Sequence, residues 1–148
     1  MGKQQRGFTL VELVFVIVIL GILAAFAIPR YVDLTEEARI ASLEGVQGTV
    51  RAAAALVKAQ AIAEEKDAAA SSSINVEGST VLTGFGYPAT AALDEALADP
   101  TAGGKVTFAA GTFRLSAAPD SANCSFSYTQ PAAAGNPPTV SALTTTGC

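Results

Sequence analysis

The sequence predicts an α+β fold, in which one long N-terminal helix over about residues 8–68 packs its C-terminal half on a four-stranded antiparallel sheet. Two patterns support this prediction. An apolar run is followed by apolar residues spaced three and four apart, which is typical of a helix. The last third of the chain alternates apolar and polar residues, as half-buried strands do. With 148 residues, the chain is long enough for one domain with a core and one extended element.

Composition excludes several kinds of enzyme. The chain has no histidine, so a Ser-His-Asp triad, a Cys-His pair and an HExxH zinc site are all unavailable. Its net charge of -4 argues against nucleic acid as a partner. The enzyme hypothesis rests only on scattered carboxylates such as Asp94, Glu95 and Asp99, which we interpret as a solvated helix face. We therefore expect a protein that is not an enzyme and uses no metal or cofactor.

The first stretch of the chain has the features of a membrane segment. Lys3 and Arg6 precede an apolar run, and the only polar side chains in residues 8–28 are Thr9 and Glu12. At 1.5 Å per residue, this run has about the length that spans a bilayer as a helix. The basic residues ahead of it favour a cytoplasmic N-terminus. We expect this segment to cross a membrane once and the remainder of the chain to lie outside.

Glu12 is unusual in such a segment. An ionised carboxylate inside a bilayer costs on the order of 3 kcal/mol, so it should be paired or lie near the interface. No basic residue of the segment is within reach. Cleavage between Gly7 and Phe8 would create an α-amino group four residues away, on the same helix or on a neighbouring chain. In two axially shifted copies, the amine of one would then pair with the carboxylate of the other, and this pairing would set the axial shift between them.

Residues 3–13 resemble the class III signal of type IV pilins, with Gly7 before the cut, Phe8 after it and Glu12 four residues later. The resemblance implies removal of residues 1–7 by prepilin peptidase, N-methylation of Phe8 and a salt bridge between Phe8 and Glu12 in assembly. It further implies a helical homopolymer, built by an assembly ATPase and an inner-membrane platform. The chain would lie in the inner membrane before assembly and in an extracellular pilus afterwards.

Two other interpretations of this stretch remain. An ordinary secretory signal would be cut after Ala25-Phe26-Ala27 and would release a protein starting at Ile28. The early Glu12 and the length of the apolar run argue against it. A plain membrane anchor explains the hydrophobicity but leaves Glu12 and the Gly-Phe junction without a role.

Gly21 and Pro29 are expected to weaken the helix. Glycine lowers helix propensity, and proline removes a backbone donor and clashes with the preceding turn. In type IV pilins, the segment between such a glycine and proline loses helical hydrogen bonds on assembly, and the resemblance implies the same for residues 21–29. An ordinary kink at the proline is the alternative.

Residues 29–148 are expected to form the head, beginning with an amphipathic helix half over residues 29–68. Its apolar stripe consists of Ile40, Leu43, Val46, Val50, Ala54, Val57 and Ala61. A connecting region, residues 69–104, should hold an extended stretch at 74–83, an aromatic turn at 84–88 and a short helix at 90–99. The strands of the sheet are predicted at residues 105–108, 112–116, 125–129 and 139–145.

The two cysteines, Cys124 and Cys148, have no further cysteine or histidine near them in sequence. This arrangement suits one disulfide better than a metal site and implies an oxidising compartment. Pilins have a C-terminal disulfide-bounded region of this kind, which residues 105–148 resemble in arrangement.

Within the family, the turn at residues 85–88 and the Asn123-Cys124 pair before a strand look most like the mannose-sensitive haemagglutinin (MSHA) pilins. The resemblance implies the major subunit of an attachment pilus. The alternative is a pseudopilin of a type II secretion system. Its major members bind calcium through an acidic cluster, for which the late chain offers Asp120 and little else.

Overall fold

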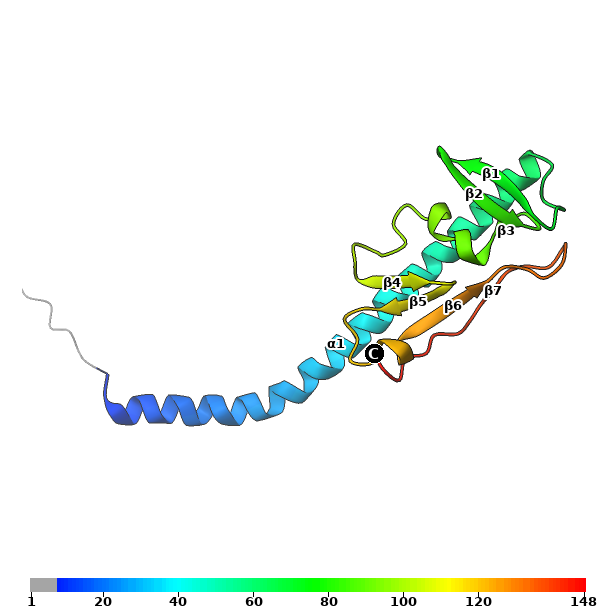
Figure 1. Cartoon of the computed structure of the whole chain (residues 1–148). Coiled ribbons are helices and arrows are strands. Elements are labelled where there is room, and N and C mark those ends of the chain that lie inside the picture. Colours follow the sequence, from blue (N-terminus) through cyan, green and yellow to red (C-terminus); the bar gives the residue numbers. More distant parts are fainter. Residues whose placement is uncertain (1–7) are drawn as a thin grey trace, which may run out of the picture. The chain divides into compact units, whose positions relative to one another are not determined.

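A computed structural model describes the backbone of residues 8–148, and the side chains of all of these except residues 27–34. The chain divides after Glu37 into two compact units, the second of which is Ala38–Cys148. One helix, α1 (Leu10–Ala63), belongs to both units and includes Gly21 and Pro29 in its length. The remaining elements all belong to the second unit (Figure 1).

Helix α1 ends at Ala63, earlier than the predicted end near residue 68. Glu65 adopts the left-handed conformation, with φ of 55°, and a residue in this conformation commonly ends an α-helix. The amide of Lys66 then donates to the carbonyl of Ala61 at 2.8 Å, and that of Glu65 donates to Ile62 at 3.1 Å. These two bonds form a Schellman motif, with glutamate where glycine is usual.

The predicted four-stranded antiparallel sheet is present, in the order β4-β5-β6-β7. Its strands are β4 (Val106–Ala109), β5 (Thr112–Leu115), β6 (Ser125–Thr129) and β7 (Thr139–Val140). Strand β7 is shorter than the predicted 139–145. The hydroxyl of Ser141 accepts a hydrogen bond from the amide of Ser127 at 2.9 Å, so a side chain replaces the backbone acceptor there. Pairing resumes only as an isolated bridge between Ser125 and Thr144.

A second sheet lies in the connecting region, where the sequence predicted only an extended stretch. It is antiparallel in the order β1-β2-β3, with β1 (Ser72–Val76), β2 (Ser79–Gly84) and β3 (Tyr87–Pro88). Two-residue turns join the strands, and both residues of each turn have positive φ, as in type I′ hairpins. These turns are Glu77-Gly78 and Phe85-Gly86.

The short helix predicted at residues 90–99 is wrong. Two single 3-10 turns occupy this stretch, η1 (Thr90–Ala92) and η2 (Asp94–Ala96). Their backbone bonds join residues three apart, and Leu97 is already extended, with ψ of 133°. The turns bury Leu93 and Leu97 without a longer helix.

The predicted stripe of α1 packs on both sheets. Leu43, Val50 and Ala54 share one buried cluster with side chains of the four-stranded sheet, including Phe113 and Tyr128. The next part of the stripe, Val57 and Ala61, packs with Ile74 and Val81 of the second sheet. The C-terminal half of the helix therefore contacts the sheets one after the other along its length (Figure 1).

Candidate functional site

The part of α1 in the first unit has an apolar surface with no core to bury it. Every residue from 8 to 26 is exposed. Its large apolar side chains range from 44% exposed at Val14 to 80% at Phe8. Soluble monomers rarely expose contiguous apolar patches larger than a few hundred Å². This surface therefore requires a partner, either lipid or protein.

The predicted membrane segment, residues 8–28, ends among residues whose side chains lie outside the described part. Within the residues that the structure describes, no helix combines the length and the apolar character needed to span a membrane.

Glu12 is bonded to Thr9 at the start of α1. The Glu12 Oε2 atom accepts from the Thr9 backbone amide at 2.9 Å and from the Thr9 hydroxyl at 2.8 Å. The Glu12 amide in turn donates to Thr9 Oγ1 at 3.3 Å. This reciprocal arrangement is a capping box, which satisfies two groups that the helix start leaves unpaired. Sequence reasoning missed it, although the T-x-x-E spacing of Thr9 and Glu12 is its signature.

The predicted partner of Glu12, the amine of a processed Phe8, does not exist in the uncut chain. Gly7, on the other side of the predicted cut, lies outside the described residues. The carboxylate is exposed and sits in the first turn of α1, where the positive end of the helix dipole favours a negative charge. It is thus accessible to a cation that approaches the helix start.

The predicted disulfide between Cys124 and Cys148 is present, and both residues are buried. The carbonyl oxygen of Cys148 accepts from Nη1 of Arg39 at 2.8 Å, which ties this last segment to α1. Gln47, only 7% exposed, donates from Nε2 to the carbonyl of Ser141 at 2.8 Å. Two polar side chains of the helix therefore hold the segment after β7, which the disulfide closes.

Asp120 lies at the entrance to the disulfide region, where it caps the turn η3 (Ser121–Asn123). The Asn123 side-chain amide donates to one carboxylate oxygen at 2.7 Å, and the Ala122 amide donates to the other at 3.1 Å. These hydrogen bonds, that from Asn123 first, lower the pKa of Asp120 below its ordinary value. Within the residues described, no three cysteine, aspartate or glutamate side chains come close enough together to hold a metal ion.

The carboxylates considered as a possible enzyme site, those of Asp94, Glu95 and Asp99, do not come together as a group of three that could hold a metal ion. Asp94 and Glu95 are exposed on η2. Asp99 accepts from the hydroxyl of Thr101 at 2.7 Å and also from the amide of Gly103, and these bonds lower its pKa. Its role is therefore local, because it stabilises the turn that follows it.

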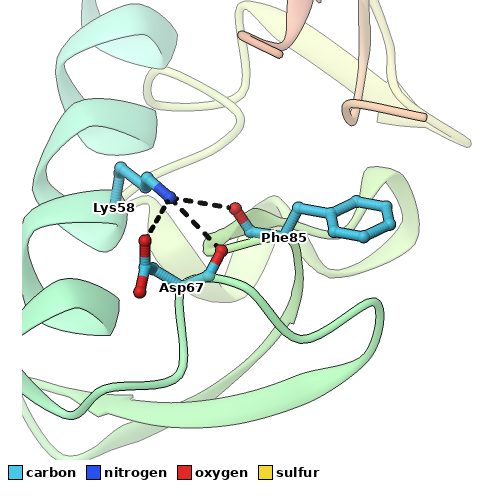
Figure 2. Close-up of polar contacts among 3 residues, drawn as sticks. All are labelled: Lys58, Asp67 and Phe85. Atoms are coloured by element: carbon cyan, nitrogen blue, oxygen red, sulfur yellow. Dashed lines mark hydrogen bonds and ion pairs between the residues drawn. The ribbon is translucent and has the colours of Figure 1, made fainter. Parts of the chain in front are cut away.

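Lys58 joins three segments of the second unit, as Figure 2 shows. Its Nζ atom lies 3.2 Å from Oδ2 of Asp67, 3.3 Å from the Asp67 carbonyl oxygen and 3.2 Å from the Phe85 carbonyl oxygen. It also lies 5.3 Å from the centre of the Tyr87 ring. The side chain thus connects α1 to the chain beyond its end and to the turn between β2 and β3.

Gly86 is required beside this lysine. Its φ of 81° favours glycine, and a Cβ atom there would lie 2.9 Å from Cα of Asp67. Sequence reasoning identified the aromatic turn but not Lys58, because no local pattern announces a contact between residues 27 positions apart.

Comparison with known proteins gives matches over part of the chain. Residues 2–28 match the family described as the prokaryotic N-terminal methylation motif. The chain is 52% identical over 58 residues to the type IV narrow pilus major component PilA5 of Thermus thermophilus, covering 39% of this chain and 50% of that protein. It is 56% identical over 46 residues to the type IV major fimbrial protein FimA of Dichelobacter nodosus, covering 31% of this chain and 28% of that protein.

A fimbrial protein of Pseudomonas aeruginosa is 55% identical over 38 residues, covering 26% of this chain and 25% of that protein. The chain spans about half the length of the Thermus relative and about a quarter of the other two. No solved structure matches the chain significantly. The chain therefore has the N-terminal methylation motif, and over part of its length it is similar to major subunits of type IV pili, which are structural proteins and not enzymes.

Proposed function

We propose that the chain is the major structural subunit of a type IV pilus, which polymerises into a surface filament for attachment. The observation that carries the proposal is the exposed apolar surface of α1 over residues 8–26. Full burial of one large apolar side chain stabilises by about 1.5–3 kcal/mol, and these fourteen are 44–80% exposed, so a lipid or protein environment is favoured by roughly 13–25 kcal/mol. Lipid supplies this environment before assembly, and the helices of other copies supply it in the filament.

Processing accompanies this function in the proposal. Prepilin peptidase cuts after Gly7 and N-methylates Phe8, and the new amine pairs with Glu12 of the same chain or of a neighbour. The match of residues 2–28 to the methylation motif supports this, as does the exposure of Glu12 at the helix start. The subunit waits in the inner membrane with its N-terminus in the cytoplasm. An assembly ATPase and a membrane platform then extract it into an extracellular filament, in which residues 21–29 lose helical hydrogen bonds.

The finer proposal is that the pilus belongs to the MSHA branch. It rests on the turn at residues 85–88 and on Asn123-Cys124 before β6. Electron microscopy of cells with and without the gene tests the function, because long surface fibres that depend on the gene are expected. Fibres confined to the periplasm would instead identify a type II secretion pseudopilin. Agglutination of red cells that mannose inhibits would support the MSHA branch.

Mass spectrometry of the mature protein tests the processing. The expected first residue is N-methyl-Phe8. A mature chain that starts at Ile28 would instead establish ordinary secretion, and a chain that keeps Lys3 and Arg6 would establish a plain membrane anchor.

A further inference from the structure

A groove with a volume of about 490 Å³ lies in the second unit. Its lining includes Arg51, Ala55 and Lys58 of α1, together with Tyr87 and the prolines Pro137 and Pro138. Its size falls in the range of ligand pockets. Because the prolines fix their own φ angles, this wall loses little entropy when a partner binds.

Arg51 is the cation that remains available in this groove. The Nζ atom of Lys58 already contacts three oxygen atoms, of Asp67 and Phe85. The Arg51 side chain is exposed and makes no hydrogen bond or ion pair with any residue that the structure describes. A guanidinium has five donors in a planar fork that matches a carboxylate. The groove therefore suits a carboxylate on a short stem that contacts its apolar walls.

The same chain presents such carboxylates elsewhere on its surface. Asp94 and Glu95 are adjacent in sequence and exposed on η2, and neither side chain has a hydrogen bond or ion pair to any described residue. The buried Leu93 and Leu97 on either side fix the position of this turn. Among the described residues of the second unit, Asp94 and Glu95 are the only two neighbouring carboxylates that are both unpaired. Four others, Glu64, Asp67, Asp99 and Asp120, are held by partners within the chain.

We infer that Asp94 and Glu95 of one copy dock into the Arg51 groove of the next copy in the polymer. The inference rests on the proposed function, because it requires that copies polymerise. The two surfaces are different patches of one chain, so the contact is heterologous, and such contacts generate open helical polymers when the rotation does not close a ring. Copies of a chain with a net charge of -4 repel one another, and Arg51 opposite Asp94 and Glu95 replaces this repulsion with attraction at the contact.

The test exchanges the charges of the two surfaces in the full-length chain. The variants are Arg51→Glu, the pair Asp94→Lys with Glu95→Lys, and all three changes together, and sheared filaments are quantified for each. Each charge reversal alone should lower the filament yield about tenfold, because like charges then face each other. The combined variant should regain most of the yield. Arg114→Glu is the matched control, because Arg114 is exposed on β5 and does not line the groove.

A cross-link gives a measurement that does not depend on yield. Cysteines introduced in one chain as Ala55→Cys, in the lining of the groove, and Glu95→Cys, which leaves Asp94 to meet Arg51, should join neighbouring copies into a ladder of multimers on non-reducing gels of filaments. Arg114→Cys with Glu95→Cys should give no ladder. The native disulfide is intact in both, so the comparison isolates the new contact.

The possible outcomes separate the inference from the function on which it rests. Normal yield from Arg51→Glu, or the absence of a ladder in abundant filaments, overturns the inference and leaves the pilus function standing. Filaments of normal yield from Arg51→Glu that no longer bind polygalacturonate beads, when filaments of the unaltered chain do bind them, would assign the groove to an external acidic saccharide and overturn docking by a second copy. Absence of filaments from the unaltered chain refutes the proposed function, and the inference with it.

Discussion

Opening the disulfide between Cys124 and Cys148 should lower the free energy of unfolding of the second unit by several kcal/mol. The two cysteines are separated by 24 positions. Closing a loop of about 25 residues restricts the unfolded chain by about 3.5 kcal/mol at 25 °C in the loop-entropy treatment. The residues are 0% and 6% exposed, so replacing each by alanine also leaves a small cavity, at about 1 kcal/mol each. Reduction alone should therefore cost about 3.5 kcal/mol, and Cys124→Ala with Cys148→Ala about 5.5 kcal/mol.

Urea unfolding of the detergent-solubilised chain measures both values. The chain has no tryptophan and three tyrosines, so in a Tyr31→Phe background the near-ultraviolet circular dichroism of Tyr87 and Tyr128 reports on the second unit rather than on the apolar helix. Unaltered protein is compared in oxidised form, in reduced form with the thiols trapped by alkylation after unfolding, and as the alanine variant. A reduced protein within about 1 kcal/mol of the oxidised one would refute the reasoning from loop closure.

Three further predictions follow from particular side chains. Lys58→Met should lower the free energy of unfolding by about 1–2 kcal/mol in thermal unfolding, because this lysine is only 21% exposed and bonds two segments. Lys66→Met is the control, and because Lys66 is 43% exposed it should cost under about 0.5 kcal/mol. Equal losses from the two variants would contradict the prediction. Glu12→Ala should leave insertion and cleavage intact in mass spectra but abolish filaments in electron micrographs. Thr9→Val keeps the carboxylate and should still assemble. Normal pili from Glu12→Ala would exclude the pairing mechanism. The pKa of Asp120 is lowered in the folded state, so its stabilisation is complete above about pH 4 and is lost as pH falls through the folded pKa. Urea titrations between about pH 5 and pH 2 should show a shallower loss for Asp120→Asn than for the unaltered chain, and identical curves would count against the prediction.

Patterns with a regular period predicted the fold well. The stripe at Leu43, Val50 and Val57 is buried as expected, because residues seven apart, or about two helical turns, lie on the same face of the helix. Strand β6 begins and ends at the predicted residues, since Phe126 and Tyr128 alternate with small polar residues. The disulfide followed from the presence of only two cysteines.

Features that depend on tertiary contacts were beyond the sequence. The second sheet turns at Glu77-Gly78 and Phe85-Gly86, where the first residue of each turn is not the asparagine or aspartate that announces a type I′ hairpin. Helix α1 ends at a left-handed Glu65 rather than at a glycine. Gln47 lies on the buried stripe because a backbone carbonyl of a distant segment satisfies its amide. The partner of Gln47 lies 94 positions away, and the turns and the helix end lack the residues that usually mark them.

The candidate site divides in the same way. Glu12 was identified by its chemistry, because a charge in an apolar run demands a partner. Its bonds to Thr9 were missed, although the T-x-x-E spacing that predicts them spans only four residues. The Lys58 contacts, in contrast, required the fold itself.

The capping box changes what pairing with Glu12 means energetically. An amine that reaches this carboxylate does not meet a bare charge, because Oε2 already accepts two hydrogen bonds from Thr9. Recognition at this position is therefore an exchange between local and incoming donors, and its net strength is the difference between them. In a single chain the Glu12 carboxylate is therefore already partly satisfied, and an incoming amine gains only the difference between its own hydrogen bonds and those of Thr9.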